Sequence, residues 1–295
     1  MGGDKMKLIK GDDIRKNKQL MKSFFQLSEE TFQLQFEQWA ELGYWNDSYC
    51  CYAFEDKGEI VANVSTSIGT MILDGQAYQS MQIGTVMTKP GYQGQGLSRK
   101  LMEAVLEDIK QAQFVYLFAN ASVLQFYTKF GFEKRRQASY HVQTADLTLQ
   151  PTEVKKLDMN EPKARKLLYE TTMHRLPLSV KMSMLQNEDI VMYHALTQYK
   201  DCIYYVPKLQ TIVICQEEDG VLELIDMISK YPVDIVEVLQ SLPITASMIQ
   251  LCFTPDELPI PVVQGILEDD GAMFVKEQSD RQYPNDVLYP YSGLA

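Results

Sequence analysis

The 295-residue sequence lacks the features that mark exported or membrane proteins. Its five cysteines, at positions 50, 51, 202, 215 and 252, are an odd number without a C-x-x-C pair, which argues against a disulfide framework. The N-terminal residues have no apolar signal core, and no apolar run approaches the length of a membrane span. We therefore expect reduced thiols in a cytoplasmic protein that has no membrane partner.

Positive charge and histidine are also scarce. Lys and Arg total 28 against 39 Asp and Glu, a net charge of −11 that would repel a phosphate backbone, so nucleic acid is not an expected partner. The three histidines, His141, His174 and His194, show no metal-ligand spacing, and no metal site is predicted. Neither a G-x-S-x-G elbow nor a cysteine-nucleophile signature occurs.

What the sequence does contain is a strand that runs into a glycine loop and then a helix. Residues 83–88 are apolar and β-branched, and Lys-Pro-Gly follows them at once, which is typical of a strand end. From Leu97 to Ile109 apolar residues recur at every fourth position, the pattern of a helix packed on a sheet. Gly94 and Gly96 lie between the two and leave main-chain N–H groups accessible at a helix N-terminus. This arrangement suits an anion such as a pyrophosphate.

The loop is neither a dinucleotide fingerprint nor a P-loop. Its letters, V-x-T-x-P-x-Y-Q-G-Q-G-L-S, resemble the acyl-CoA-binding motif of the GNAT (Gcn5-related) N-acetyltransferases, in which Q/R-x-x-G-x-G/A is filled here by Gln93, Gly96 and Ser98. Ser98 departs from the usual Gly or Ala. A second resemblance follows the next predicted strand, where a short helix carries Tyr127 and ends at Phe130-Gly131-Phe132, as in the second GNAT signature.

The resemblance implies acetyl-CoA as cosubstrate. Main-chain groups at 86–88 would pair with the pantetheine arm like an added strand, the Met87 N–H would face the thioester oxygen, and a bulge would separate this strand from the next. The residues implied at the cofactor are Val86, Met87, Thr88, Gln93, Gly94, Gln95, Gly96, Leu97, Ser98, Arg99, Asn120 and Ser122.

Acetyl transfer also needs a proton for the leaving thiolate and a base for the amine. The resemblance makes Tyr127 the general acid, although helix spacing alone would favour a core aromatic beside Phe126 and Phe130. No carboxylate occurs between positions 75 and 102 to act as the base. One alternative is ordered water with main-chain carbonyls, and a second is a side-chain carboxylate of the helical region. A third, by analogy with the enhanced-intracellular-survival acetyltransferases, is the Ala295 carboxylate. The side-chain carboxylates are Glu30, Glu37, Glu41 and Asp47.

The order of elements agrees with a GNAT α+β fold, a mixed, mostly antiparallel sheet flanked by helices. In the first half we expect strands at 7–10, 49–54, 60–68, 76–88 and 114–119, more strands up to about 149, and helices at 12–27, 29–42, 97–112 and 122–129, with Ser28 capping the second helix. Phe32, Phe36 and Trp39 of that helix form either a core-facing stripe, which is the favoured interpretation, or an acceptor pocket.

The second half echoes the first, with a seam at Gln150-Pro151. Expected here are a helix capped by Asn160 with Pro162 in its first turn, and further helices at 187–199 and 233–242. Strands are expected at 202–206, 211–217, 221–229 and 247–253, with a hairpin across 269–271. We predict a catalytic domain at 1–150 and a degenerate GNAT-like domain at 151–295, similar to the front two domains of enhanced-intracellular-survival acetyltransferases. In the second half, Pro232 and Asp234 stand where the glycine loop would be, so CoA is not expected to bind there.

These patterns lead to one main hypothesis and two alternatives. The main hypothesis is an acetyl-CoA-dependent N-acetyltransferase for a small cationic amine such as an aminoglycoside or polyamine, which an acidic protein would attract. The alternatives are a non-catalytic acyl-CoA sensor or interaction protein, and an acetyltransferase for a peptide or protein amine. The oligomeric state is left open, with a homo-oligomer as one alternative.

Overall fold

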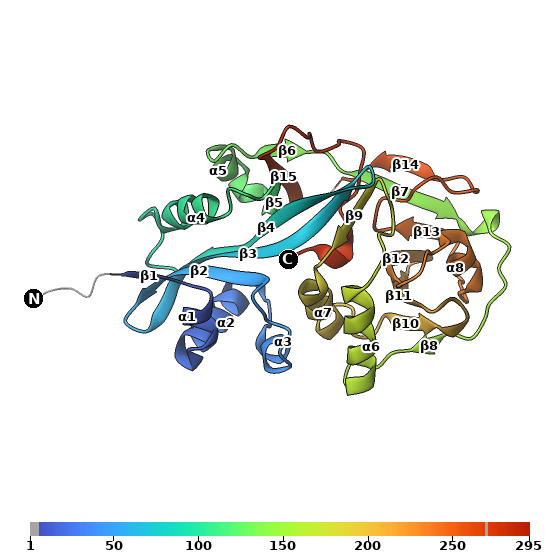
Figure 1. Cartoon of the computed structure of the whole chain (residues 1–295), viewed down its shortest axis with the longest axis horizontal. Coiled ribbons are helices and arrows are strands. Elements are labelled where there is room, and N and C mark those ends of the chain that lie inside the picture. Colours follow the sequence, from blue (N-terminus) through green and yellow to red (C-terminus); the bar gives the residue numbers. More distant parts are fainter. Residues whose placement is uncertain (1–5, 269–270) are drawn as a thin grey trace, which may run out of the picture.

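The computed structural model describes residues 6–268 and 271–295. It is an α+β structure with two mixed sheets, each accompanied by helices (Figure 1). Among the described residues, none of the helices combines the length and the apolar character needed to cross a membrane.

The first sheet carries most of the strands that come from the predicted glycine-loop half. Its order is β1-β2-β3-β4-β5-β15-β6, and β9 pairs with the far end of β3. The strands are β1 (Lys7–Lys10), β2 (Tyr49–Asp56), β3 (Glu59–Leu73), β4 (Gln76–Thr88), β5 (Phe114–Asn120), β15 (Gly271–Glu277), β6 (Glu133–Arg135) and β9 (Met182–Leu185).

The second sheet repeats the same series of pairings in the order β8-β10-β11-β12-β13-β7-β14. In each sheet an antiparallel pair with a register shift is followed by a parallel pair and then by an antiparallel one. The strands are β8 (Lys155–Lys156), β10 (Ile203–Val206), β11 (Thr211–Glu218), β12 (Val221–Ile228), β13 (Met248–Leu251), β7 (Ala138–Gln143) and β14 (Val263–Ile266). This is the tandem GNAT-like architecture that the sequence predicts.

The two sheets exchange strands across the predicted seam. β15, from the second half of the chain, lies between β5 and β6 in the first sheet, whereas β7, from the first half, lies between β13 and β14 in the second. Sheet membership therefore does not follow a cut at position 150. The predicted hairpin across 269–271 is also wrong, because β14 and β15 pair in different sheets; residues 269–270 of its turn lie outside the described residues.

The helices before β2 differ from those expected. α1 (Asp12–Arg15) is short, and α2 (Lys18–Phe32) begins after Asn17, whose side chain accepts hydrogen bonds from the second and third residues of the helix. Ser28 is not a cap: it is buried inside α2 and donates its hydroxyl to the Phe24 carbonyl. Of the expected helix at 29–42, residues 29–32 belong to α2, and only α3 (Glu37–Glu41) forms a separate helix.

The remaining helices match the expected positions closely. They are α4 (Leu97–Asp108), α5 (Leu124–Thr128), α6 (Pro162–Met173), α7 (Glu188–Leu196) and α8 (Ile235–Ser241), with short 3₁₀ turns at Ala121–Val123, Thr144–Asp146, Pro207–Leu209 and Tyr291–Gly293. One apolar core joins α2 and α3 with α7 and the face of β10–β12, so the two halves share buried side chains. The Trp39 indole donates to the main-chain oxygen of Asp189, at 2.8 Å, inside this core.

The strand exchange predicts that residues 1–150 will not fold alone. Such a fragment lacks β15, which covers the edge of β5, and it carries β7 without β13 and β14. We expect the fragment to be aggregated or unfolded by circular dichroism, whereas the whole chain melts cooperatively. A soluble fragment with a cooperative melt would show that the strand exchange is dispensable.

Candidate active site

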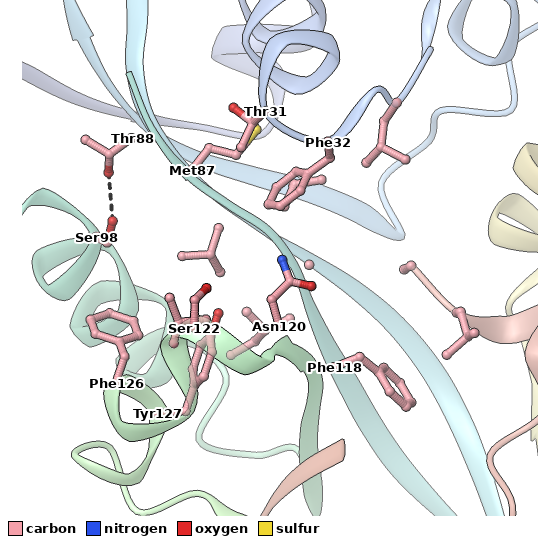
Figure 2. Close-up of a pocket in the computed structure, with 18 of the residues that line it drawn as sticks. Thr31, Phe32, Met87, Thr88, Ser98, Phe118, Asn120, Ser122, Phe126 and Tyr127 are labelled. Carbon is pink, nitrogen blue, oxygen red and sulfur yellow. Dashed lines mark hydrogen bonds between the residues drawn. The ribbon is translucent and has the colours of Figure 1, made fainter. Parts of the chain in front are cut away.

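Strands β4 and β5 lie side by side over only part of their length. They pair in parallel over Ser80–Ile83 and Phe114–Leu117, and no further pair of described residues joins them. β4 continues to Thr88 and β5 to Asn120, so the strands diverge and leave a gap between their carboxyl ends (Figure 2). The main-chain groups of β4 that face this gap can pair with an extended ligand.

A β-bulge in β4 lies where the gap opens. The register with β3 shifts between Asn63, which is opposite Met87, and Ser65, which is opposite Gly84, so two β4 residues face one β3 residue. Thr85 lies in this bulge with a left-handed φ of 41°. This is the strand on which the cofactor resemblance implies a bulge.

Buried polar side chains hold Thr85 in this conformation. Its hydroxyl lies 2.6 Å from Ser65 Oγ and 3.1 Å from the Tyr49 hydroxyl, and its carbonyl accepts a 3.1 Å bond from Asn63 Nδ2. All four side chains are buried, and unpaired groups here would be costly. The network therefore offsets the roughly 1–3 kcal/mol that left-handed backbone costs a non-glycine residue.

The loop between β4 and α4 has glycine wherever its backbone is left-handed. Gly91, Gly94 and Gly96 have φ values of 90°, 76° and 74°, and a Cβ built on any of them would meet no atom within 4 Å. This open, glycine-lined helix N-terminus fits a phosphate group. The Ser98 hydroxyl lies 2.8 Å from that of Thr88 (Figure 2), so the departure from Gly or Ala at this position is accommodated by an internal hydrogen bond.

One cavity of about 1090 Å³ joins the gap to the space between α2 and α7. All but one of the residues predicted to bind the cofactor line it. The exception is Gln95, whose side-chain amide turns back to donate to the Gly91 carbonyl. The lining members are Val86, Met87, Thr88, Gln93, Gly94, Gly96, Leu97, Ser98, Arg99, Asn120 and Ser122.

Tyr127 extends from α5 into the cavity (Figure 2). Its ring packs against Phe126, Phe132 and Phe274, and no hydrogen bond among the described residues engages its hydroxyl. Burial raises the pKa of Tyr127 to about 12, so the hydroxyl keeps its proton at neutral pH. A protonated, unengaged hydroxyl at this point can donate to a ligand atom.

The Met87 side chain is buried in the core shared with α2. Any contribution of this residue to chemistry must therefore come from its main chain.

The far end of the cavity is formed by residues that sequence patterns did not bring together. Phe32 and Phe36, from the end of α2 and the segment after it, meet Tyr193 and His194 of α7 there. The sequence allowed either a core-facing stripe or an acceptor pocket for these aromatic residues. Phe36 and Trp39 fit both descriptions, because they are buried in the core and also line the cavity. No sequence pattern pointed to Tyr193 and His194 as cavity residues, because only the fold places α7 beside α2.

The segment 293–295 is held against β4 and α7. The Gln82 amide donates to the Ala295 main-chain oxygen at 3.1 Å, the Tyr289 hydroxyl to the Gly293 carbonyl at 2.9 Å, and His194 Nε2 lies 2.5 Å from the Leu294 carbonyl. Burial lowers the pKa of His194, so the ring is neutral at pH 7 with its proton on Nε2. Among the bases considered from the sequence, the four carboxylate side chains lie outside the lining, whereas Ala295 lies within it.

In the second sheet, the described residues between β12 and α8 form no comparable glycine loop. Where β12 leads to α8, Asp234 accepts hydrogen bonds from the main-chain N–H groups of Val236 and Glu237. The carboxylate therefore occupies the helix start that a phosphate would need.

Asp189, in the first turn of α7, is a buried carboxylate whose two oxygens have no hydrogen-bond partner among the described residues. Burial raises the pKa of Asp189 to about 7. The folded protein therefore binds this proton more tightly than the unfolded chain, and its stability falls as the pH rises from about 4 to about 7.

A mixed sheet that splays around a bulge, with a glycine loop before the following helix, has the geometry of the acyl-CoA N-acyltransferase fold. Residues 5–135 match the acetyltransferase (GNAT) domain family. This part of the chain is therefore a GNAT acetyltransferase domain.

Solved structures extend the likeness to both sheets. A probable N-acyltransferase of Enterococcus faecalis V583 superposes with a TM-score of 0.62 at 17% identity, covering 93% of this chain and 73% of that one. Eis1 from Mycobacterium abscessus gives the same TM-score at 14% identity, with 93% and 74% covered. At these identities the likeness concerns the fold.

Among characterised sequences, the histone acetyltransferase TAP1 of Glycine max is 42% identical over 53 residues, 17% of this chain and 23% of that protein. The probable acetyltransferase TAP2 of the same plant is similar over the same length. The matched part thus spans less than a quarter of each of these relatives.

Gly96→Ala should weaken acetyl-CoA binding about tenfold or more. Left-handed backbone costs a residue with a Cβ about 1–2 kcal/mol, and the new methyl group would enter the space proposed for phosphate. Calorimetric titration measures the affinity. Gly75→Ala is the matched control, because Gly75 has the same φ of 74° and open surroundings in the turn between β3 and β4. Equal affinities for both variants would remove Gly96 from the binding site.

Asp189→Asn should flatten the dependence of stability on pH. We expect the melting temperature of the variant, relative to the native protein, to rise by several degrees between pH 5 and pH 8, because the native protein alone must bury a charge above its folded pKa of about 7. Scanning calorimetry at both pH values measures the difference. Parallel curves would show that Asp189 does not titrate in this range.

Proposed function

We propose that the protein transfers the acetyl group of acetyl-CoA to the amine of a small acceptor by direct attack on the thioester. The observation that carries this proposal is that the glycine loop, the bulged β4 edge and the unengaged Tyr127 hydroxyl line one cavity. The cosubstrate's pyrophosphate would lie at Gly94 and Gly96, and its pantetheine arm along residues 86–88.

The reaction proceeds within the gap between β4 and β5. The neutral amine nitrogen attacks the thioester carbon, and the Met87 N–H stabilises the developing oxyanion. The C–S bond then breaks, and the sulfur takes its proton from Tyr127 as the general acid. The surplus proton on the attacking nitrogen passes to solvent, and solvent returns a proton to the Tyr127 oxygen. With a pKa of about 12, Tyr127 is fully protonated before each turnover.

The attacking amine must first lose a proton. Among the described residues, no Asp or Glu side chain lines the cavity, so a side-chain carboxylate is not proposed as the base. Water, main-chain carbonyls near the bulge, and the oxygen atoms of Ala295 remain as proton acceptors. Thr85 of the bulge and Ala295 both line the cavity in which the acceptor amine would bind.

The first test is calorimetric titration of acetyl-CoA into the whole chain, followed by assay of free thiol with a panel of amines. One-to-one binding with amine-dependent thiol release is the expected outcome. Binding without thiol release for any amine would favour a non-catalytic acyl-CoA sensor. Absence of binding would overturn the proposal.

Tyr127→Phe should keep acetyl-CoA binding and lose about 10²- to 10⁴-fold of the transfer rate, because the ring still packs but donates no proton. Thiol release under saturating acetyl-CoA measures the loss. Unchanged turnover in the variant would exclude Tyr127 as the acid.

In the native enzyme kcat/KM should rise from pH 7 to pH 10 as the amine deprotonates. The profile should show no falling limb in this range, because the pKa of Tyr127 is about 12.

A further inference from the structure

Thr85 adopts a backbone conformation that its residue type disfavours. The other non-glycine residues of the described chain with a left-handed φ lie in turns or directly beyond the end of a helix or strand. Thr85 differs from them because it is β-branched and lies inside a strand, β4. Such conformations persist only where surrounding contacts fix them, and they concentrate at functional sites. The contacts that fix Thr85 are therefore candidates for a functional role.

The bulge at Thr85 decides which way the rest of β4 faces. Residues three apart point to opposite faces of a regular strand, yet Ile83 and Val86 both join the apolar cluster beneath α4. Met87 joins the opposite cluster, on the α2 side. The extra residue therefore reverses the alternation of the strand, for main-chain groups as well as for side chains. Which N–H groups face the gap beyond Thr85 depends on this reversal.

The buried polar cluster at the bulge consists of Tyr49, Asn63, Ser65 and Thr85, and Asn63 bonds the Thr85 main chain. Asn63 Nδ2 donates to the Thr85 carbonyl at 3.1 Å, and it lies 2.9 Å from Ser65 Oγ and 3.2 Å from Thr85 Oγ1. Because a carbonyl can only accept, the amide nitrogen must face it. Asn63 Oδ1 is buried without a hydrogen-bond partner among the described residues, which costs stability. This side chain therefore leaves one of its own groups unpaired while it holds the bulge.

Asn63 itself cannot contact a ligand. It is fully buried and lies outside the cavity lining, whereas Tyr49 and Thr85 of the same cluster line the cavity. Any influence of Asn63 on a bound thioester must therefore pass through Thr85. A displacement of about 1 Å in the groups that position a reaction can lower its rate about 100-fold.

Resting on the proposed function, we propose that Asn63 is a positioning residue for acetyl transfer. By bonding the Thr85 carbonyl it fixes the bulge, and the bulge directs main-chain N–H groups of residues 86–88 into the gap where the thioester would lie. The hydroxyls of Tyr49 and Ser65 hold the Thr85 side chain. Asn63 sets the course of the backbone. It should therefore govern the rate of transfer, whereas the affinity for acetyl-CoA depends on the glycine loop.

Asn63→Ala should lower kcat about 10- to 100-fold and change the dissociation constant for acetyl-CoA by less than about threefold. Thiol release at saturating acetyl-CoA, with the fastest amine of the panel above, measures kcat, and calorimetric titration measures binding. The matched control is Ser65→Ala, which removes a fully buried hydroxyl of the same cluster but leaves the bond to the Thr85 carbonyl. It should lower kcat by no more than about threefold. Equal losses of kcat in the two variants would overturn the role given to Asn63.

Thr85→Gly supplies a second background for the same comparison. Glycine adopts a left-handed φ without a partner to hold it, so adding Asn63→Ala to Thr85→Gly should lower kcat further by no more than about threefold. A loss of 10- to 100-fold in both backgrounds would show that Asn63 does not act through the conformation of residue 85. If Asn63→Ala does not fold, Asn63→Ser, whose hydroxyl is too short to reach the Thr85 carbonyl, replaces it in both comparisons.

The native protein separates this inference from the function on which it rests. Unchanged kcat in the Asn63 variants of a chain that transfers acetyl groups would overturn the inference and leave the proposed function intact. A native chain that binds acetyl-CoA and releases no thiol with any amine would overturn both.

Discussion

The departure of β4 from β5 is the constraint on which the rest of the site depends. A regular parallel pairing up to Thr88 would close the gap and cover the main-chain groups that a pantetheine arm needs. Hydroxyl and amide groups on the neighbouring strands β2 and β3 maintain this separation, because they hold Thr85 in a left-handed conformation through hydrogen bonds. The opening therefore belongs to the resting fold, and a ligand entering it need not break the sheet.

The second half of the chain contributes to the site through its surface and not through a second cofactor loop. Asp234 takes the place that phosphate would occupy, whereas α7 supplies Ile190, Tyr193 and His194 to the wall facing α2. A degenerate repeat can lose its own binding site and still shape the substrate pocket of its neighbour. The shared core around Trp39 and Ile190 fixes the position of that wall relative to the bulge.

Sequence reasoning found what is encoded locally. The glycine loop, the amphipathic helix after it and most strand positions follow from patterns within a few residues. The residues that the GNAT resemblance implied at the cofactor, Gln95 excepted, line one cavity, and their role stays a prediction. It failed where local rules compete or long-range contacts decide. Ser28 was a plausible cap, but Asn17 bonds the helix start and Ser28 bonds inside the helix.

The exchange of β7 and β15 could not be read from local patterns either, because each strand has the same composition whichever sheet receives it. The juxtaposition of α7 with α2, which creates the far end of the cavity, depends on the packing of residues about 150 positions apart. The identity of the acceptor stays a prediction for a different reason: net charge is a property of the whole surface, and specificity is a property of the cavity lining.

The placement of β15 also has a consequence for synthesis. β5 is complete at Asn120, yet its outer edge stays unpaired until residues 271–277 have emerged from the ribosome. At about 5–20 residues per second this interval lasts on the order of 10–30 s. During that time an apolar strand edge is open to pairing with other chains. The first sheet is therefore complete only after residues 271–277 have been synthesised.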